Sequence, residues 1–300
     1  MISVFIDGGH GTTGLEIRDR LAGRGDVTLV EIDEPLRKDD QAREQALNDA
    51  DVAILCLPDD AARAAVALIR NDRTKVIDAS TAHRTTEGWT FGFPEVVGHD
   101  AVAGAKRVSN PGCYSTGFIA LVAPLVKAGL IGKDAKLSCN AVSGYSGGGK
   151  AMIAEFESGL APTAWRSYAL TLAHKHVPEM QVRCGLGHAP LFAPSVANLY
   201  RGMIVDVPLF DVDAGAVRDV LAAAYDGSWI VTVRDFEEAA LTIEYAAGTD
   251  RLDLFVFGRG DGSQVRLVAA LDNLGKGASG AAVQSLNLMA GLPETEGLAI

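Results

Sequence analysis

Short apolar runs alternate with helix-like stretches along the first eighty residues. A continuous apolar run between two helices is typical of a strand buried on both faces of a parallel sheet. We expect strands at 3–7, 27–32, 52–57 and 75–80, and helices at 15–21, 41–47 and 61–69. This order predicts an α/β fold of the Rossmann type, a doubly wound parallel sheet that binds ligands at the carboxyl ends of its strands.

The pattern changes after residue 112. A helix-like stretch at 116–128 contains Pro124, which we expect to kink or break the helix. The later runs alternate apolar and polar residues, which predicts a largely antiparallel sheet with one covered face. These strands are expected at 137–143, 203–209, 229–233, 252–258 and 265–271. The result is a second domain of the α+β class, whose uncovered sheet face is suited to pairing with a second subunit.

We therefore place a dinucleotide-binding domain at 1–112 and a catalytic and dimerisation domain at 113–275. The final stretch, DNLGKGASGAAVQSLNLMAG, predicts a glycine loop followed by a helix. Residues 276–300 are expected to return and complete the first domain.

Composition narrows the class of protein. The 300 residues are 48% apolar, which is enough to bury a full core. No apolar run reaches the ~18 residues of a membrane span. The net charge is −11, and Lys and Arg are scattered, which argues against a nucleic-acid partner. The four cysteines lie far apart and are expected to be reduced thiols, so we expect a cytoplasmic protein with no membrane contact.

A glycine loop directly follows the first predicted strand. IDGGHGTTG places Gly8, Gly11 and Gly14 three residues apart at the start of the first helix. In that context a glycine loop meets the pyrophosphate of a dinucleotide. The alternative interpretation is an ordinary turn between a strand and a helix.

The end of the second strand bears on the choice of dinucleotide. Glu31 or Asp33 would accept the ribose hydroxyls of NAD and repel the extra phosphate of NADP. Arg37 and Lys38 follow closely and would reverse that preference. These residues leave the choice between NAD and NADP open.

The most informative cysteine is Cys113, in SNPGCYSTG. Pro111 and Gly112 force a tight turn just before the helix-like stretch, which puts the thiol at a helix N-terminus. There the helix dipole and free N–H groups favour the thiolate, and the same N–H groups would hold an oxyanion. We interpret Cys113 as a nucleophile; the alternative is a small buried apolar residue, which describes Cys56 and Cys139 well.

A nucleophilic thiolate needs an acid or base nearby, and HKHVPE supplies His174, His176 and Glu179 within six residues. In an extended segment the two histidines would share a face. The same three side chains would also suit a metal ion, although no further His or Cys lies close in sequence. A pair of surface histidines is the remaining alternative.

Arg84 follows DASTAH at the end of a predicted parallel strand. A guanidinium at that edge of the sheet is placed to clamp a carboxylate. The alternative is a surface salt bridge.

A second glycine-rich loop spans residues 143–151. Gly144, Gly149 and Lys150 have the spacing of the phosphate-binding loop of nucleotide triphosphate enzymes. The residue that should hold magnesium through a hydroxyl is Ala151, so the match fails at its metal ligand. The loop can still offer backbone N–H groups to an anion.

Six segments together carry a resemblance to a known family. They are IDGGHGTTGLEIR, AILCLPDD, NPGCYSTG, AVSGYSGGGK, LAHKHVPEM and NLGKGASGAAVQSLNLM. In this order, and nearly end to end, the chain resembles the shorter form of N-acetyl-gamma-glutamyl-phosphate reductase. Aspartate-semialdehyde dehydrogenases share the two-domain plan, the cysteine and the tail, but HKHVPE and SGYSGGGK point to the acetylglutamyl branch.

The resemblance implies a reaction. Such an enzyme reduces N-acetyl-γ-glutamyl phosphate to the semialdehyde with NADPH and releases inorganic phosphate, in arginine biosynthesis. By this resemblance Cys113 forms a thioacyl intermediate. His176 is our choice of acid and base, with His174 as the close alternative, and Glu179 would orient one of the two imidazoles.

The resemblance also implies binding residues. On the substrate side these are Arg84 for the carboxylate, Tyr168, and, around the phosphate, Ser143, Ser146, Gly147 and Lys150. On the cofactor side they are Gly8, Gly11, Thr12, Thr13 and Gly14 at the pyrophosphate, Ser80, and Asn273, Lys276 and Gly277 toward the nicotinamide. The cofactor is NADP by this resemblance alone, and we expect no metal ion and a homodimer or homotetramer.

Other substrates and other classes of protein stay open. Relatives act on aspartate semialdehyde or on acyl phosphates attached to carrier proteins, although the net charge of −11 disfavours an acidic carrier. A dinucleotide-binding regulator without turnover would bind cofactor, but its Cys113 would not react with an acyl phosphate. A metal-dependent hydrolase built around HKHVPE would lose activity with a chelator.

Overall fold

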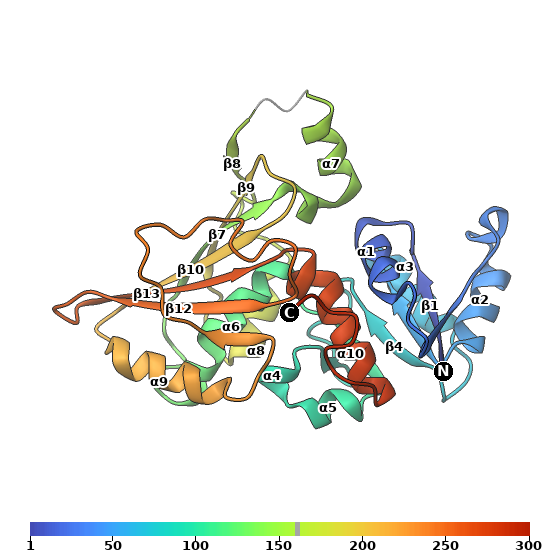
Figure 1. Cartoon of the computed structure of the whole chain (residues 1–300), viewed down its shortest axis with the longest axis horizontal. Helices are drawn as coiled ribbons and strands as arrows, with labels where there is room; N and C mark the ends of the chain where they lie inside the picture. The colour runs from blue at the N-terminus through green and yellow to red at the C-terminus, as the bar shows by residue number, and fades with distance from the viewer. Residues whose placement is uncertain (160–162) are drawn as a thin grey trace. The chain divides into compact units, whose positions relative to one another are not determined.

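The computed structural model describes residues 1–159 and 163–300, which divide into two compact units. The first unit comprises Met1–Pro111 and Ala278–Leu298, and the second comprises Gly112–Gly277 and Ala299–Ile300. Each unit is built on its own β-sheet (Figure 1).

The first unit is a parallel sheet with strand order β2-β1-β3-β4-β6-β5. Its strands are β1 (Ile2–Asp7), β2 (Val27–Val30), β3 (Val52–Leu55), β4 (Lys75–Asp78), β5 (Thr90–Phe91) and β6 (Arg107–Ser109). Its helices are α1 (Thr12–Leu21), the 3₁₀ helix η1 (Glu34–Leu36), α2 (Asp40–Asp49), α3 (Asp59–Leu68), α4 (Pro94–Val97), α5 (His99–Ala103) and α10 (Gly280–Ala290). This arrangement confirms the predicted doubly wound, Rossmann-type fold.

Helices cover both faces of this sheet, which explains the continuous apolar runs. Val52 and Ile54 of β3 lie in a core shared with α1 and α10. The alternate residues of the same strand, Ala53 and Leu55, lie in a second core shared with α2 and α3. All of β3 is therefore buried, as expected for a central strand of a parallel sheet.

The second unit is a mixed sheet with strand order β11-β12-β13-β10-β7-β9-β8. Its strands are β7 (Ser138–Gly144), β8 (Trp165–Ser167), β9 (Leu191–Ala197), β10 (Met203–Phe210), β11 (Val231–Val233), β12 (Leu252–Gly258) and β13 (Gln264–Leu271). The pairs β7·β9 and β11·β12 are parallel, and the others are antiparallel. The largely antiparallel sheet of the prediction is confirmed.

The helices of the second unit are α6 (Cys113–Lys127), the 3₁₀ helix η2 (Tyr145–Gly148), α7 (Gly149–Glu157), α8 (Val177–Cys184) and α9 (Ala214–Ala224). The π-helix η3 (Gly275–Ser279) begins in this unit, and its last two residues belong to the first. Helix α6 packs on β10 and β13. The contact is close, since a Cβ added at Gly117 would lie 2.7 Å from Val205 Cγ2. Val205 belongs to the alternating set of buried residues in β10, so the predicted covered face is the one under α6.

Pro124 was expected to kink or break its helix, and the break is wrong. Helix α6 continues through Pro124 to Lys127. A proline has no N–H to donate to the carbonyl four residues earlier, which here is that of Ala120. The buried hydroxyl of Tyr225, at the C-terminal end of α9, donates a hydrogen bond to this carbonyl at 2.8 Å. It replaces the hydrogen bond that Pro124 cannot donate.

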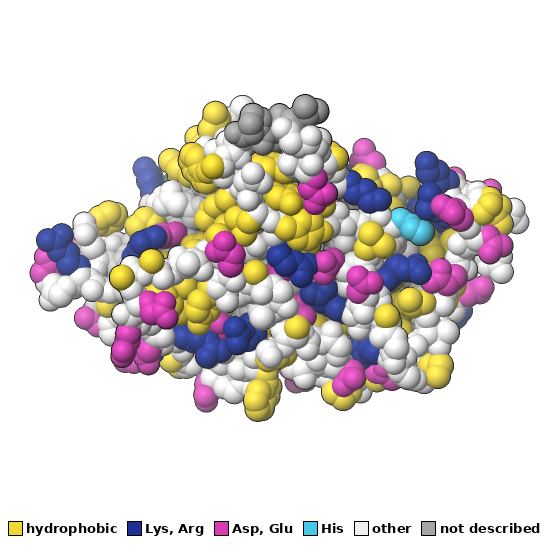
Figure 2. Space-filling model, turned by 45° about the horizontal axis from the view of Figure 1, so that its top comes forward, with side chains coloured by type: hydrophobic (Ala, Val, Ile, Leu, Met, Phe, Trp, Pro, Cys, Tyr) yellow, Lys and Arg dark blue, Asp and Glu magenta, His cyan; other side chains and the backbone are white. Residues whose placement is uncertain are grey.

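The second unit exposes several large apolar side chains. The face drawn in Figure 2 shows hydrophobic side chains gathered over part of the molecule, with acidic and basic side chains interspersed elsewhere. Exposed large apolar side chains in this unit include Trp165, Leu170, Leu172, Phe210 and Trp229. In the part of the chain that the structure describes, no helix combines the length and apolar composition needed to cross a bilayer.

Candidate active site

The glycine loop of the first unit connects β1 to α1, and its glycines are required by packing. Gly8 has φ +83°, and a Cβ there would lie 2.3 Å from the carbonyl oxygen of Cys56 at the end of β3. A Cβ at Gly14 would lie 2.6 Å from the carbonyl oxygen of Gly8. The loop is thus folded tightly between the ends of β1 and β3, where the order of the strands reverses and an open sheet of this kind binds its ligand.

Helix α1 begins directly after this loop. Gly11 is its N-cap and, among the described residues, no side chain caps the helix there. Thr12, Thr13 and Gly14 form the first turn, so their N–H groups lie where a helix binds an anion. The loop and the turn fit the pyrophosphate of a dinucleotide.

Two ion pairs lie near the carboxyl ends of β1 and β2. Arg43 of α2 reaches Asp7 at 2.8 Å, and both side chains are mostly buried. Arg18 of α1 reaches Glu31, directly after β2, at 2.7 Å, but these side chains are 33% and 57% exposed. Removing one partner of a buried pair costs about 3–5 kcal/mol, whereas an exposed pair contributes only about 0–1 kcal/mol. The Arg18–Glu31 pair is therefore the easier of the two to open.

Ser80 and Arg84 occupy the turn after β4. The Ser80 hydroxyl donates to the buried carboxylate of Asp78 at 2.7 Å, and His83 Nδ1 lies 2.6 Å from the same carboxylate. Arg84 is buried, and its Nε donates to the carbonyl of Asn110 at 2.9 Å. The alternative of a surface salt bridge at Arg84 is wrong, because its guanidinium is held within the first unit beside the start of the NPGC turn.

Cys113 is the first residue of α6, as the turn predicted. Its N-cap, Gly112, donates its N–H to the buried carboxylate of Glu179 at 3.2 Å. A Cβ at Gly277 would lie 2.9 Å from Cys113 Cβ, so only glycine permits this approach. None of the four cysteines, all within the described residues, is in a disulfide, and burial raises the pKa of Cys139 and Cys184 well above the usual range. Cys113 differs from them because it is partly exposed at the start of a long helix.

The HKHVPE segment is a turn that leads into α8, not an extended strand. His176 is the N-cap of α8, and the N–H of Val177 donates to the carbonyl of His174. The two imidazoles still adjoin, with ring centroids 4.7 Å apart and nearly perpendicular planes. His174 Nδ1 accepts the backbone N–H of His176 at 3.1 Å. Because a backbone N–H can only donate, neutral His174 carries its proton on Nε2.

Tyr114 is the residue of this region that the sequence did not single out. Its ring lies 6.1 Å from that of His174, 6.0 Å from that of His176 and 5.2 Å from that of Phe192. Its hydroxyl donates to the carbonyl of Ser195 at 3.0 Å and accepts from the hydroxyl of Tyr168 at 3.1 Å. The available signal was its position next to Cys113, but the contacts depend on β9, which was not predicted.

Tyr168 lies beside the cysteine as well. Burial raises the pKa of Tyr168 to about 12, and the negative charge of Cys113 adds to this while the hydrogen bond to Tyr114 opposes it. The phenol therefore stays protonated at neutral pH and remains a hydrogen-bond donor. Cys113, Tyr114, Tyr168 and the two histidines form one continuous cluster in the second unit.

The SGYSGGGK loop joins the end of β7 to α7 through η2. The N–H groups of Gly144, Tyr145 and Ser146 donate to carbonyls of the 199–202 segment. These three N–H groups are thus committed within the protein, so the backbone N–H groups that the loop was expected to offer to an anion must come from its later residues. Gly147 and Lys150 are exposed. An anion at this loop would meet them, and not the N–H groups at its start.

The tail residue Asn273 holds this loop in place. Its Nδ2 donates to Ser146 Oγ at 2.8 Å, and its Oδ1 accepts the N–H of Gly202 at 3.0 Å. Both ends of the amide are therefore used inside the second unit. Lys276 is buried in η3, and the buried Ser143 donates its hydroxyl to the carbonyl of Gly144 at 2.9 Å.

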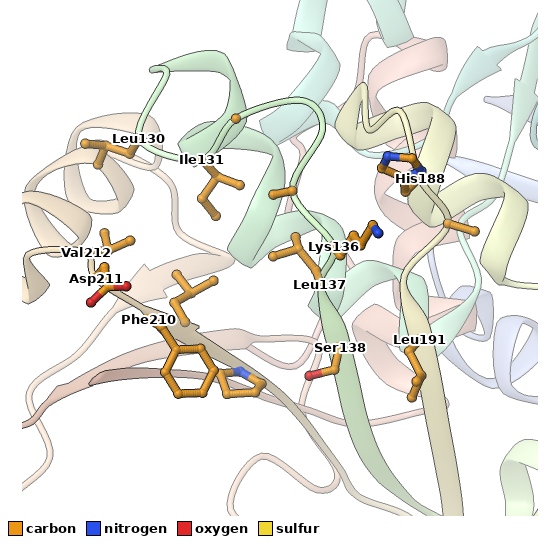
Figure 3. A pocket seen from close by; sticks show the side chains of 15 residues that line it. Leu130, Ile131, Lys136, Leu137, Ser138, His188, Leu191, Phe210, Asp211 and Val212 are labelled. Carbon is orange, nitrogen blue, oxygen red and sulfur yellow. The ribbon is translucent and has the colours of Figure 1, made fainter. Parts of the chain in front are cut away.

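A cavity of about 900 Å³ lies elsewhere in the second unit (Figure 3). It is lined by the start of β7, the end of β10 and the segment after α6, and includes Leu137, Leu191 and Phe210. Its described lining includes none of the predicted site residues. Because β7 spans roughly 20 Å, the cavity is well removed from Ser143 and the SGYSGGGK loop at the other end of that strand. Within residues 1–159 and 163–300, no group of three or more His, Cys, Asp or Glu side chains is arranged to hold a metal ion.

Solved structures share this fold. Aspartate semialdehyde dehydrogenase II from Vibrio cholerae matches with a TM-score of 0.71 at 19% identity, covering 97% of this chain and 98% of that one. A probable aspartate-semialdehyde dehydrogenase from Pseudomonas aeruginosa matches with a TM-score of 0.72 at 17% identity, covering 96% and 98%. At these identities the likeness establishes the fold.

Family comparisons are more specific. Residues 29–104 match the NAD binding domain of semialdehyde dehydrogenase, and residues 113–273 match its dimerisation domain, which makes the chain an oxidoreductase of the semialdehyde dehydrogenase class. N-acetyl-gamma-glutamyl-phosphate reductase of Sinorhizobium medicae is 50% identical over 303 residues, 95% of this chain and 98% of the relative. That of Brucella ovis is 50% identical over 305 residues, 96% and 98%. The chain belongs to the N-acetyl-gamma-glutamyl-phosphate reductase family, as the resemblance predicted.

Proposed function

We propose that the chain reduces N-acetyl-γ-glutamyl phosphate to N-acetylglutamate semialdehyde, with NADPH as reductant and release of phosphate, as a step in arginine biosynthesis. The observation that carries this proposal is the cluster around Cys113: a partly exposed thiol at the first position of α6, with two adjoining imidazoles and a tyrosine beside it. The names of relatives at 50% identity supply the substrate.

In the first half of the reaction, the thiolate of Cys113 attacks the acyl carbon. A carbon–sulfur bond forms and the carbonyl oxygen becomes an oxyanion, which the N–H groups of the first turn of α6 are placed to stabilise. The oxyanion then collapses, the bond from carbon to the phosphate oxygen breaks, and phosphate leaves a thioester on Cys113. The N–H of Gly112 is held by Glu179, which fixes the turn that presents the thiol.

The second half needs a hydride for the thioester carbon, which NADPH would supply when bound. Cys113 would then leave as the thiolate, which yields the aldehyde. The protein must therefore hold the thiolate ready twice, once to attack and once to leave, and a stabilised thiolate serves both steps.

The hydrogen bonding of the two histidines separates their roles. If His174 accepted a second proton, its Nδ1 would lose the hydrogen bond from the N–H of His176. We therefore assign the acid and base to His176, and we assign to His174 a neutral role in which Nε2–H donates to the substrate or its oxyanion. Glu179 holds the N–H of Gly112 and is a positioning residue, and we keep for it the further role of orienting one of the two imidazoles.

The two histidine roles are testable by substitution. His176→Asn should lower kcat by about 10²–10⁴-fold and flatten the pH profile. His174→Asn keeps an acceptor for the N–H of His176, so it should lower kcat by less and leave the pH profile in place. The reverse ranking, measured in steady-state pH profiles, would transfer the acid and base role to His174.

Substrate and cofactor binding follow the same proposal. We assign Tyr168, Ser143, Ser146, Gly147 and Lys150 to the acyl phosphate, and Arg84 to the substrate carboxylate. On the cofactor side we assign Gly8, Gly11, Thr12, Thr13 and Gly14 to the pyrophosphate, with Ser80, Lys276 and Gly277 on the nicotinamide side. The sequence also placed Asn273 there, but its amide is bonded to Ser146 and Gly202, so we assign it to the support of the SGYSGGGK loop. The absence of a Cβ at Gly8 and Gly14 supports the first of these sets. A homodimer or homotetramer in the cytoplasm completes the proposal, and the matched dimerisation domain supports self-association.

The deciding experiment is the reverse reaction. Purified protein is mixed with N-acetylglutamate semialdehyde, inorganic phosphate and NADP⁺ or NAD⁺, and the absorbance of the reduced nicotinamide is followed. We expect phosphate-dependent reduction of NADP⁺, and a loss of about a thousandfold or more in Cys113→Ser. An undiminished rate in the variant would remove Cys113 from the mechanism. Turnover only with aspartate semialdehyde would reassign the substrate, and loss of activity with a chelator would favour the metal-dependent alternative.

A further inference from the structure

The carboxyl end of β2 carries an ion pair whose partners come from different elements. Glu31 directly follows the strand, and Arg18 comes from α1. Arg18 NH2 lies 2.7 Å from Glu31 Oε1, and Arg18 NH1 lies 3.5 Å from Glu31 Oε2, so the guanidinium lies along both carboxylate oxygens. Both side chains are partly open to solvent.

This pair lies where the ribose of a bound dinucleotide belongs. In a doubly wound sheet the loop after the first strand meets the pyrophosphate, and the residue after the second strand meets the adjoining ribose. The side chain of Arg18 spans the two positions. At one end its Cδ would be 3.5 Å from a Cβ placed at Gly9, and at the other end its guanidinium holds Glu31.

The other cations near this edge are held differently. Arg43 is locked on the buried carboxylate of Asp7, whose hydrogen bond raises the pKa of the guanidinium, and it also touches Asp40. Arg37 pairs with Glu34 at 3.6 Å on an exposed 3₁₀ turn. Of these three arginines, Arg18 alone both lies beside the glycine loop and has an exposed partner that water can replace at little cost.

We propose that Arg18 binds the 2′-phosphate of NADP and that Glu31 is the counter-ion it releases on binding. This inference rests on the proposed function, because it concerns the dinucleotide that the reductase uses. A phosphate dianion carries more charge than a carboxylate and accepts the planar guanidinium through two hydrogen bonds. Glu31 is exposed enough to turn into solvent when Arg18 leaves it.

The pair also explains how a carboxylate at this position is compatible with NADP. Glu31 would select NAD if it were free to accept the ribose hydroxyls. Here Arg18 occupies those carboxylate oxygens, so Glu31 is not available to the ribose hydroxyls of NAD until the pair opens. NADP supplies the phosphate that opens it, and NAD does not.

The test is calorimetric binding of NADP⁺ and of NAD⁺ to the full chain, without substrate. Wild-type protein should bind NADP⁺ more tightly than NAD⁺. Arg18→Met keeps much of the aliphatic packing and should weaken NADP⁺ by about 10–100-fold, the value of one charged hydrogen-bonding contact, with NAD⁺ unchanged or slightly tighter. Glu31→Gln should tighten NADP⁺ several-fold, and the matched control Arg37→Met should change neither ligand by more than about twofold.

Three results would overturn the inference. The first is tighter binding of NAD⁺ than of NADP⁺ by the wild type, and the second is an equal loss of affinity for both dinucleotides in Arg18→Met. The third is weaker NAD⁺ binding in Glu31→Gln with no change for NADP⁺. Unchanged melting temperatures of the variants would show that each result reports on binding. These outcomes are independent of the reductase assay, since binding is measured without turnover. An Arg18-dependent preference for NADP⁺ in a protein that fails the reverse reaction would uphold this inference and remove the proposed function.

Discussion

Two loops of this chain are both rich in glycine, but different interactions hold them in the structure. IDGGHGTTG joins β1 to α1 in the first unit, and SGYSGGGK joins β7 to α7 in the second. In the first loop the glycines are needed because main chain passes close by, as at Gly8 against the carbonyl of Cys56. In the second loop the leading N–H groups are already bonded to the 199–202 segment, and a side chain, Asn273, holds the loop from outside.

The comparison shows that a glycine-rich loop binds an anion only through the backbone N–H groups that the protein itself does not use. The number of glycines does not decide this. The first loop depends on backbone shape and ends at an N-cap without a side-chain cap among the described residues. The second depends on side chains that fix its position. Substitutions that alter backbone shape should therefore damage the first loop most, and loss of a polar side chain should damage the second.

The largest effect is expected for Gly8→Ala. The left-handed backbone and the 2.3 Å approach to the carbonyl of Cys56 leave no room for a methyl group. We expect a loss of roughly 2–4 kcal/mol in unfolding free energy and a loss of NADP⁺ binding beyond detection, measured by denaturant titration and calorimetry. Gly25→Ala, where a Cβ would meet nothing within 4 Å, is the matched control. If Gly8→Ala bound NADP⁺ normally, the loop would not be the pyrophosphate site.

An intermediate effect is expected for Asn273→Ala. The change leaves the buried N–H of Gly202 without its acceptor and frees Ser146, at a cost of about 1–3 kcal/mol. Because the SGYSGGGK loop would lose its support, we expect the KM for phosphate in the reverse reaction to rise by about tenfold, with NADP⁺ binding little changed. Weakened NADP⁺ binding with an unchanged KM for phosphate would instead place Asn273 on the cofactor.

The smallest effect is expected for Lys150→Met. Lys150 is exposed in the first turn of α7, so its charge acts on a bound phosphate through solvent. We expect the KM for phosphate to rise only a few-fold, and more at low salt than at high salt. A hundredfold loss, or magnesium-dependent binding of ATP by the wild type, would show that the second loop works as a nucleotide site after all.

The sequence predicted those parts of the fold whose signal is local. Strands β1, β3 and β4 were found because a strand buried on both faces leaves a continuous apolar run. Strand β5 has two residues and β6 has three, too few to show a period. Strand β9 contains Pro194, which disfavours a strand prediction, and its neighbour β8 is short.

In the candidate site, too, the residues with a local sequence signal were predicted, and those that depend on tertiary contacts were not. Cys113 was recognised from the tight turn before it, and the two histidines from their H-x-H spacing, both of which can be read directly from the chain. Glu179 accepts a hydrogen bond from a backbone N–H 67 residues away. Tyr114 is held by contacts with Phe192 and Ser195 on β9. Contacts of this kind depend on tertiary packing, which no local pattern carries.

Helix α10 has a consequence for the order in which the chain folds during synthesis. It comes from the last tenth of the chain, yet Val283, Leu286 and Met289 complete the same core as Val4 and Ile6 of the first strand. A ribosome emits β1 long before it emits α10. Until α10 is made, the sheet face of the first unit that α10 packs on is covered only in part, by α1 and α5, while the sheet strands of the second unit are all available earlier. Newly made N-terminal segments of this protein are the ones that need protection from aggregation.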